Sequence, residues 1–388
     1  MKNFICLILL ISFIPSFGIW REVNTPTSEH LNKIEIINGI AFCVGNNGTL
    51  LKSTDEGENW TAVTNPSTGN ITSILFITSN LGFFTTSDGK VFKTTNGGSS
   101  WTIKTLQSGG INGISFKDNS TGIAAGDNGN FFKTTDGGAN WTNLGSQSVF
   151  VVNDLTFVND TLAVAVGPLG SLLYSTNAGS SWNYQGVSTT ETFSAIEKKN
   201  DATAVIVGTN GTYLEFSATS LTTNSIKTID TNKDWLKDVH VTIKENDFER
   251  VIAVGFSSSI LINNNSFKSW DLDSVNNLNG IHFFNDTIGV ACGFDGKIYK
   301  TVTGGVPTSS KEIKREKISL YPNPTNNLIY FQKYELDNRY EVYNMNGSLM
   351  LNGILQNNYL DVSMLSSGNY LIRLVGDRKL SSGRFVKK

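Results

Sequence analysis

Two histidines and one glutamate are the residues of this chain whose types and positions could bind a metal ion. Glu35, His240 and His282 are each flanked on both sides by apolar residues, which predicts equivalent positions on three similar strands. Imidazole nitrogens and a carboxylate form a common ligand set for transition metals. Hydrogen bonding between neighbouring strands would use the same side chains, and it is the interpretation we favour. No metal and no cofactor are therefore expected.

Aromatic and acidic residues in predicted turns are the candidates for ligand binding. Trp235 lies in a segment, 231–238, that interrupts the repeat described below, so packing of the repeat does not require it. Phe256 and Phe294 stand in turns that are otherwise small and polar. The acidic candidates in turns of this kind are Asp88, Asp127 and Asp295. Each of these residues could also serve only to form its hairpin turn.

Residues with the spacing of a known catalytic site are missing from the sequence. There is neither a Ser-His-Asp arrangement nor a phosphate-binding glycine loop. No predicted turn offers a persuasive pair of carboxylates, which glycoside hydrolysis would require. Charge is balanced, with 31 Lys and Arg against 33 Asp and Glu, which argues against a nucleic-acid partner. The sequence favours binding over catalysis.

An internal repeat defines the elements that must position these residues. The pattern Ser/Thr-x-Asp/Asn-x-Gly-x-x-Trp ends at Trp60, Trp101, Trp141 and Trp182, at steps of 41, 40 and 41 residues. Its side-chain oxygens can bond nearby backbone N–H groups, and its glycine permits an unusual backbone conformation. Its tryptophan buries a large ring. The residues expected to hold these loops include Ser53, Asp55, Gly57, Asp136 and Gly138.

A period of about 40 residues with four short strand patterns is typical of a propeller blade. Trp20 resembles the residue that follows each repeat loop, whereas the repeat ending at Gly305 stops before its tryptophan. Residues 20–23 are therefore expected to supply the outer strand of the last blade and close the ring. About 288 residues separate Trp20 from the missing tryptophan, which at 41 per blade gives seven. The predicted fold is all-β: a seven-bladed β-propeller over residues 19–305, followed by a small β-sandwich.

The repeat resembles the Asp box of bacterial neuraminidases. Together with the preceding pattern at 126–134, it more closely resembles the propellers related to the photosystem II assembly and stability factor. Asp boxes occur in several functional classes. The sialidase resemblance would imply three arginines that hold a substrate carboxylate, but this propeller contains only Arg21 and Arg250. The arginine patch associated with the photosystem factor is also missing, so neither activity carries over.

The C-terminal part has its own resemblance. Residues 306–317 form a charged linker, and residues 318–388 alternate strand patterns with glycine turns. The order resembles the C-terminal sorting domain of the type IX secretion system of Bacteroidota, through Tyr321, Pro322, Asn323, Pro324, Gly368, Tyr370 and a lysine end. This resemblance implies export by that machinery, with the tail usually removed and the protein released or attached to the surface. A carbohydrate-binding or fibronectin-like sandwich is the alternative.

The N-terminal residues 1–18 have the pattern of a secretory signal peptide, with Lys2 followed by an apolar run and small residues. That run is shorter than the roughly 20 residues of a membrane-spanning helix. No other stretch could span a membrane. Removal of this segment would take Cys6 with it and leave Cys43 and Cys292. We favour buried free thiols over a disulfide between them.

These features predict a protein that passes through the periplasm and is then secreted or attached to the outer cell surface. Its propeller is expected to be non-catalytic and to recognise or adhere to a glycan or a protein. Two alternatives stay open: an extracellular glycoside-active enzyme with an unfamiliar site, and an assembly or stability factor. An integral membrane protein and a nucleic-acid binder are not expected.

Overall fold

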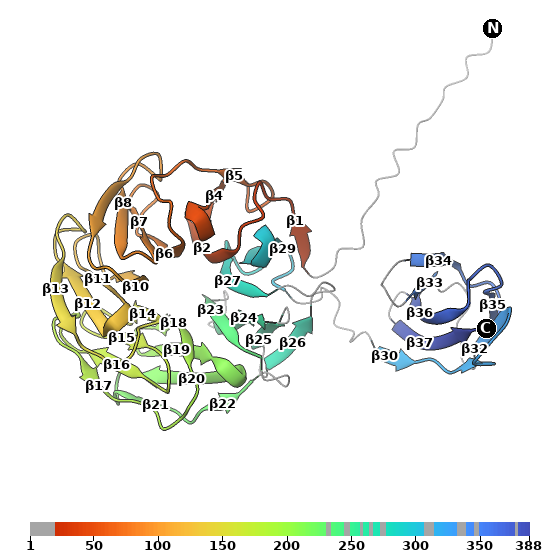
Figure 1. Cartoon of the computed structure of the whole chain (residues 1–388). Coiled ribbons are helices and arrows are strands. Elements are labelled where there is room, and N and C mark those ends of the chain that lie inside the picture. Colours follow the sequence, from red (N-terminus) through yellow and green to blue (C-terminus); the bar gives the residue numbers. More distant parts are fainter. Residues whose placement is uncertain are drawn as a thin grey trace, which may run out of the picture. The chain divides into compact units, whose positions relative to one another are not determined.

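The repeats fold into seven antiparallel sheets arranged as blades around a central channel in the computed structural model (Figure 1). The structure describes residues 20–229, 234–243, 249–256, 259–263, 267–271, 277–305, 314–331, 339–344, 349–376 and 379–388. Two compact units, Met1–Val306 and Pro307–Lys388, divide the chain. The seven-bladed propeller and the small β-sandwich predicted from the sequence are both confirmed. The predicted signal peptide lies outside the described residues.

Blades one to four each contain four strands in chain order, from the channel outward. Blade one comprises β2 (Leu31–Ile37), β3 (Ile40–Gly45), β4 (Leu50–Ser53) and β5 (Thr61–Ala62). Blade two comprises β6 (Ile71–Phe76), β7 (Gly82–Thr86), β8 (Lys90–Thr94) and β9 (Thr102–Thr105). Blade three comprises β10 (Ile111–Phe116), β11 (Gly122–Gly126), β12 (Asn130–Thr134) and β13 (Thr142–Ser146). Blade four comprises β14 (Asp154–Phe157), β15 (Ala163–Val166), β16 (Leu172–Ser175) and β17 (Asn183–Tyr184).

Blades five to seven depart from this order in small ways. Blade five comprises β18 (Phe193–Asn200), β19 (Thr203–Gly208) and β20 (Thr212–Ser217), whose outer edge pairs with both β21 (Thr222–Thr223) and β22 (Lys227–Thr228). Blade six comprises β23 (Leu236–Ile243), β24 (Glu249–Gly255), β25 (Ser259–Asn263) and β26 (Phe267–Asp271). Blade seven comprises β27 (Leu278–Phe283), β28 (Gly289–Gly293), β29 (Ile298–Thr301) and β1 (Arg21–Val23). The repeat interruption around 231–238 therefore follows an extra outer strand, β22.

The ring closes through the N-terminal strand, as predicted. Arg21 pairs with Lys300 and Val23 pairs with Ile298, so β1 is the outer strand of blade seven. Trp20 packs edge-on against Phe283 of the same blade, with 6.0 Å between ring centroids. Closure therefore gives blade seven its fourth strand and covers the edge of β29.

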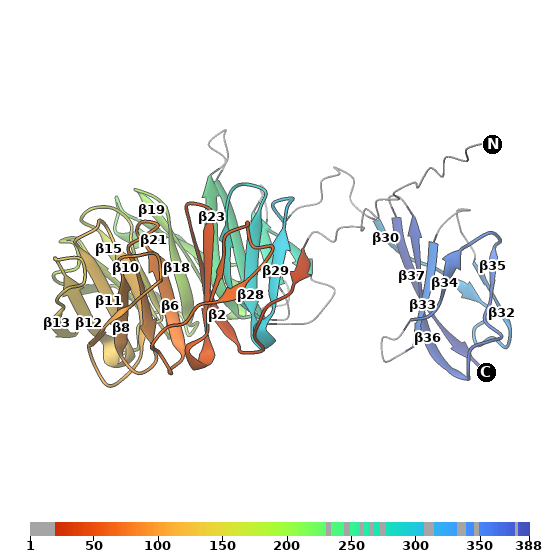
Figure 2. The same cartoon turned by 90° about the horizontal axis from the view of Figure 1, so that it is seen from above.

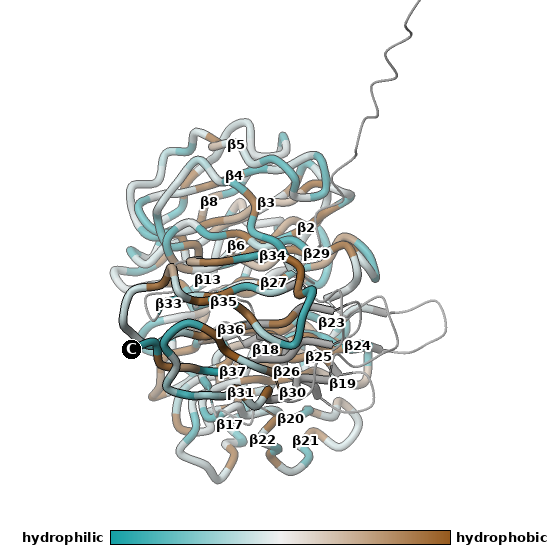
Figure 3. Tube along the Cα trace, turned by 90° about the vertical axis from the view of Figure 1, so that its right-hand side faces the viewer, coloured by the Kyte–Doolittle hydropathy of each residue, from teal (hydrophilic) through white to brown (hydrophobic). Residues whose placement is uncertain are grey.

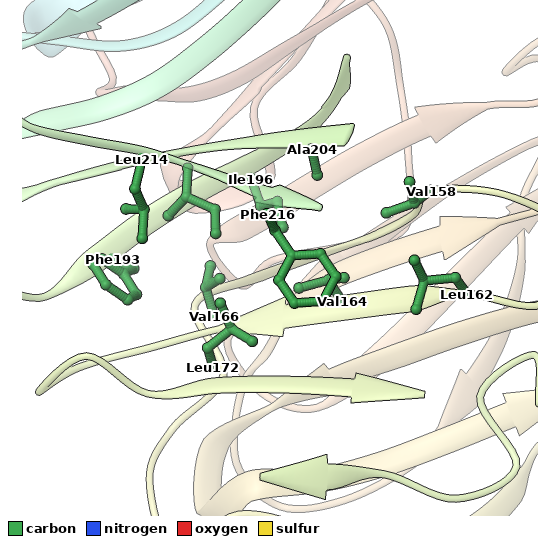
Figure 4. Close-up of a cluster of buried hydrophobic side chains, with 11 residues drawn as sticks. Val158, Leu162, Val164, Val166, Leu172, Phe193, Ile196, Ala204, Leu214 and Phe216 are labelled. Carbon is green, nitrogen blue, oxygen red and sulfur yellow. The ribbon is translucent and has the colours of Figure 1, made fainter. Parts of the chain in front are cut away.

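Apolar side chains between the blades form the core. The second strand of each repeat lies in the middle of its blade, and β3, β7, β11, β15 and β28 are buried at all or nearly all positions. Figure 4 shows one such cluster, in which Val164 and Leu172 of blade four meet Phe193 and Phe216 of blade five. Burial on both faces explains why these strands read as continuous apolar runs.

The repeat loops, Ser53–Trp60 and its three counterparts, share one set of hydrogen bonds. In the first loop, Ser53 Oγ accepts the Gly57 N–H at 2.9 Å and Asp55 Oδ1 accepts the Asn59 N–H at 3.0 Å. Gly57 has φ +81°, and a Cβ there would lie 2.6 Å from Val290 of the preceding blade, so only glycine fits. Trp60 is buried in the same seam between blades one and seven. Each loop thus fastens its blade to the one before.

Strand direction assigns every turn to one of two faces, which Figure 2 shows edge-on. The repeat loops lie on one face, here called the repeat-loop face. The turns between second and third strands lie on the other, together with the connections between blades; we call it the connection face. These turns place a residue with positive φ at their centre, as at Asn47, Asn128, Asn210 and Asp295. Asn and Asp tolerate this conformation better than most residues.

The second unit packs two sheets around its own core, and Figure 3 shows apolar and polar stretches alternating along the chain. One sheet contains β30 (Lys314–Lys317), β37 (Lys379–Lys387), β36 (Gly368–Gly376), β33 (Arg339–Asn344) and β34 (Leu349–Ile354); the other contains β31 (Leu320–Tyr321), β32 (Leu328–Phe331) and β35 (Tyr359–Asp361). The last four residues of the expected linker therefore form a strand, because β30 pairs in parallel with β37.

The residues that suggested a sorting domain connect the opening of this unit to its last strand. Asn323 donates through Nδ2 to the Arg384 carbonyl and accepts the Val386 N–H, both at 2.9 Å. Tyr370 is buried, and its hydroxyl donates to the Ser366 carbonyl at 2.9 Å. Tyr321, in contrast, is 50% exposed and stacks on Tyr330. Pro322 and Pro324 flank Asn323, and Gly368 begins β36.

Candidate binding site

A β-bulge near the start of six of the seven inner strands directs one side chain toward the channel. The pairing register shifts by one residue there in six blades, and Asn153 takes the equivalent place just before β14. Bulges commonly re-aim side chains in this way. The seven residues are Asn32, Thr72, Asn112, Asn153, Ser194, Lys237 and Asn279, here called the bulge ring.

Five members of the bulge ring tie their blade to the next one. Each donates a side-chain hydrogen bond to the backbone carbonyl that opens the next inner strand: Asn279 to Leu31, Asn32 to Ile71, Thr72 to Ile111, Asn112 to Val152 and Asn153 to Phe193. The four asparagine bonds measure between 2.8 and 3.0 Å. The same bond therefore crosses five consecutive seams.

The pattern changes at blades five and six. Ser194 accepts a hydrogen bond from the indole N–H of Trp235. Lys237, which replaces an amide in blade six, holds its ammonium 3.9 Å from the ring centre of Trp235 and 5.6 Å from that of Phe256. This geometry is a cation–π interaction. Burial lowers the pKa of Lys237.

An aromatic row crosses blades six, seven and one at this point. The ring centroids of Trp235 and Phe256 lie 5.4 Å apart, and those of Phe256 and Phe294 lie 6.1 Å apart. His30 stacks on Phe294 at 4.3 Å, and its Nδ1 accepts the Asp295 N–H at 3.0 Å. All four rings are partly exposed. The structure thus brings together three aromatic residues that the sequence proposed separately.

Sequence reasoning missed His30 and Lys237. One signal could have found them: His30 precedes Asn32 as Trp235 precedes Lys237, so His30 and Trp235 occupy one repeat position. At this position the other blades carry smaller side chains, such as Asn70 and Thr192. The large rings of His30 and Trp235 at a repeat position that is otherwise small were therefore visible in the sequence.

The aromatic row and the bulge ring line one cavity at the connection face, with a volume of about 610 Å³. We call it the upper chamber. Its wall includes Trp235, Phe256, Phe294 and His30 on one side and Asn112 and Asn153 on the other. A size of this order and a mixed aromatic and polar lining are typical of ligand-binding pockets.

A second cavity of about 660 Å³, the lower chamber, extends along the channel toward the repeat-loop face. Asp154 and Lys33 line both chambers. Lys33 Nζ lies 2.7 Å from Asp238 Oδ1. Burial opposes the charge of Lys33, but Asp238, Asp154 and Glu197 outweigh it and raise its pKa.

Asp154 is the carboxylate with the clearest shift in the channel. Burial raises its pKa to about 6, although Lys33 acts against this change. Its oxygens accept the Leu155 N–H at 2.9 Å and the Ile196 N–H at 3.1 Å. Asp238 makes the equivalent contact with the Ile281 N–H at 3.0 Å. Both carboxylates therefore connect their blade to the next inner strand.

The three residues considered for metal binding do meet in the lower chamber. His282 Nδ1 lies 3.5 Å from Glu35 and accepts the Ile36 N–H at 3.1 Å. The rings of His240 and His282 are 4.2 Å apart, while His240 Nδ1 lies 3.0 Å from Glu197. Within the described residues, no group of three or more His, Cys, Asp or Glu side chains is placed to hold a metal ion.

The acidic turn residues lie apart from one another. Asp88 accepts hydrogen bonds from Thr86 and Lys90 of its own turn, and Asp127 accepts the Gly110 N–H at 2.7 Å. Asp295 is exposed beside His30. Among these aspartates only Asp295 adjoins the aromatic row.

Two other sets of residues have structural partners. Arg21 pairs with Glu58 at the rim, and Arg250 is buried and donates to the carbonyls of Gly304 and Asp286. Cys43 and Cys292 are buried free thiols in neighbouring blades.

Among the described residues, no helix has the length and apolar character needed to cross a membrane.

Two parts of the chain match known families. Residues 19–148 match the family model described as photosynthesis system II assembly factor YCF48, and residues 319–388 match the secretion system C-terminal sorting domain. No curated protein sequence gives a match.

Solved structures share the propeller fold. A structure described as YCF48 bound to D1 peptide is 20% identical, with a TM-score of 0.61, and the match covers 74% of this chain and 98% of that one. YCF48 from Cyanidioschyzon merolae is 18% identical at the same TM-score, covering 73% and 99%. U3-55K is 10% identical, also at 0.61, covering 73% and 98%. Identities this low establish the fold alone.

These matches agree with the repeats, the closed ring and the C-terminal sandwich. The protein is a secreted or cell-surface β-propeller that resembles the photosystem II assembly factor propellers and carries a type IX secretion C-terminal sorting domain.

Proposed function

We propose that this protein is a non-catalytic recognition module that holds an extracellular glycan or protein at the connection face of its propeller. The observation that carries the proposal is the partly exposed aromatic row Trp235, Phe256, Phe294 and His30 on the wall of the upper chamber. Aromatic residues with one accessible face supply much of the energy of recognition sites.

The arginines and the channel aspartates of the propeller already have partners within the protein, which supports binding over catalysis. Arg21 and Arg250, the arginines of the propeller, are held by Glu58 and by backbone carbonyls, so neither is available for a substrate carboxylate. Asp154 and Asp238 each accept a backbone N–H from the neighbouring blade. Carboxylates fixed in this way support the packing of the inner strands.

Two further proposals follow from the resemblances. Because one structural neighbour is described as bound to a peptide, a protein ligand is a reasonable choice beside a glycan, and an assembly role is the alternative function. For export, residues 1–18 would act as a signal peptide in a Bacteroidota-type host. The type IX machinery would then recognise the C-terminal domain and carry the protein across the outer membrane.

The test measures binding of the exported form of the protein to an array of glycans and to an array of peptides. We expect binding that Trp235→Ala weakens at least ten-fold and that Trp235→Phe largely retains. Tyr184→Ala is the matched control, because Tyr184 is 55% exposed on the outer strand of blade four. Equal binding by Trp235→Ala and Tyr184→Ala would place the ligand elsewhere. Cleavage of a bound glycan would show that the protein is an enzyme.

A further inference from the structure

The orientation of the bulge-ring amides follows from chemistry. A backbone carbonyl can only accept a hydrogen bond, so each asparagine that bonds across a seam must direct its NH2 group at that carbonyl. The amide oxygen is then left for another partner. Within the described part of the chain, no donor reaches Oδ1 of Asn32, Asn112, Asn153 or Asn279, and all four side chains are partly exposed.

Two other groups of the upper chamber are acceptors too. Thr72 uses its single hydroxyl proton toward Ile111, so it accepts from the Thr85 hydroxyl 2.9 Å away and keeps one lone pair for another donor. Asp154, below the ring, has carboxylate oxygens that each take one backbone N–H and retain capacity for another donor. The seam bonds therefore give the upper chamber hydrogen-bond acceptors from blades one to four and seven, while blades six, seven and one add aromatic faces.

We propose that the upper chamber binds the terminal residue of a neutral glycan. Its hydroxyl groups would donate to the amide oxygens of Asn112, Asn153 and Asn279, while a C–H face of the sugar ring packs on the row formed by Trp235 and Phe294. This inference rests on the function proposed above and narrows its ligand to a hydroxyl-rich, uncharged class.

Charge on the chamber wall disfavours the other ligand classes. A basic peptide side chain would also satisfy the acceptors, but Lys237 lines the same chamber and would repel it. Lys33 contributes less to this repulsion, because Asp238 already pairs with it. An acidic sugar could pair with Lys237, yet its carboxylate would face Asp154 and the ring of amide oxygens. Neutral hydroxyls avoid both conflicts.

The experiment measures binding of the exported protein to neutral oligosaccharides built from glucose, mannose, galactose or xylose. For any oligosaccharide that binds, we expect Asn153→Ala and Asn112→Ala each to weaken binding several-fold, and the pair together at least ten-fold. Replacement of single sugar hydroxyls by hydrogen tests the same bonds without changing the protein. One or more of these deoxy sugars should bind several-fold more weakly.

Thermal unfolding of each variant shows that a loss of binding is not a loss of folding. The inference is overturned if none of the neutral oligosaccharides binds at millimolar concentration, or if the deoxy sugars all bind as well as the parent. If a lysine-rich peptide binds and Trp235→Ala weakens that binding, the glycan ligand is wrong but the proposed recognition function stands. If a glycan binds and Trp235→Ala has no effect, both the glycan site and the proposed recognition site are wrong.

Discussion

The two faces of the propeller differ in how regularly equivalent side chains make the same contact. On the repeat-loop face, Ser53 and Asp55 make the same bonds as Thr134 and Asp136 two blades away. On the connection face, the seven equivalent positions make three kinds of contact: a bond across a seam at five positions, Ser194 accepting from Trp235, and Lys237 over an aromatic ring. Repetition of a contact indicates a structural role, and departure from it indicates where to look for function.

Aspartate pKa values differ in the same way between the two regions. Hydrogen bonds from the Asn59 and Asn140 backbone and side chains lower the pKa of Asp55 and of Asp136 to about 2. Burial raises the pKa of Asp154 to about 6. The repeat-loop aspartates are therefore stabilised as anions, while the channel holds a carboxyl that retains its proton into the weakly acidic range.

The strongest test of the comparison replaces one tryptophan in each region with alanine. Trp60→Ala should lower the free energy of unfolding by about 3–5 kcal/mol, because Trp60 is 6% exposed and fills the seam between blades one and seven. Trp235→Ala should cost on the order of 1 kcal/mol, since its ring is partly exposed. Chemical denaturation measures both. Equal losses would mean that Trp235 is a packing residue.

Removal of one repeat-loop hydroxyl should have the next largest effect. Ser53→Ala leaves the buried N–H of Gly57 without its acceptor, which should cost about 1–3 kcal/mol of unfolding free energy. Ser99→Ala is the control, because Ser99 is exposed in the corresponding loop and should change stability by less than about 0.5 kcal/mol. A negligible effect at Ser53 would contradict a structural role for the repeated contact.

A seam bond of the bulge ring should contribute less to stability. Asn153→Ala removes the donor to the Phe193 carbonyl, and we expect a loss of about 0.5–1.5 kcal/mol in denaturation experiments. Ser194→Ala, at the seam without this bond, should cost less because it frees only the indole N–H of Trp235, a partly exposed residue. A larger loss at Ser194 would show that the contact between Ser194 and Trp235 stabilises the fold more than the asparagine bond does.

A different kind of effect is expected on the pH dependence of stability. Asp154 has a raised folded pKa, so the folded state binds more protons than the unfolded state between about pH 4 and 6. This group therefore lowers the free energy of unfolding as pH rises through that window. Asp55 has a lowered pKa and acts in the opposite sense, because its contribution is lost as pH falls from about 4 to 2.

Asp154→Asn should remove the decline between pH 4 and 6, whatever its effect on absolute stability. Asp55→Asn should change only the region below about pH 4. Denaturation at a series of pH values measures both slopes. An unchanged slope in Asp154→Asn would mean that this carboxyl does not titrate in the folded channel as we expect.

The sequence determined the blades, because each is a regular repeat of residues close together in the chain, and it indicated the closed ring through the incomplete repeats at its two ends. The composition and strand patterns after residue 305 indicated the separate C-terminal unit. It also indicated Trp235, Phe256 and Phe294 one by one, as side chains that the repeat does not need. Only the tertiary structure placed His30 against Phe294, 264 residues away, and Lys237 over Trp235.

Ring closure is the physical reason for this division. A repeat loop forms from eight neighbouring residues, so its pattern is legible in the sequence. Contacts across the channel depend on the combined packing angles of all seven blades and on the bulge that turns each inner strand. The sequence alone therefore located the wall of the upper chamber only in part, and the bulge ring emerged only when seven strands were brought around one axis.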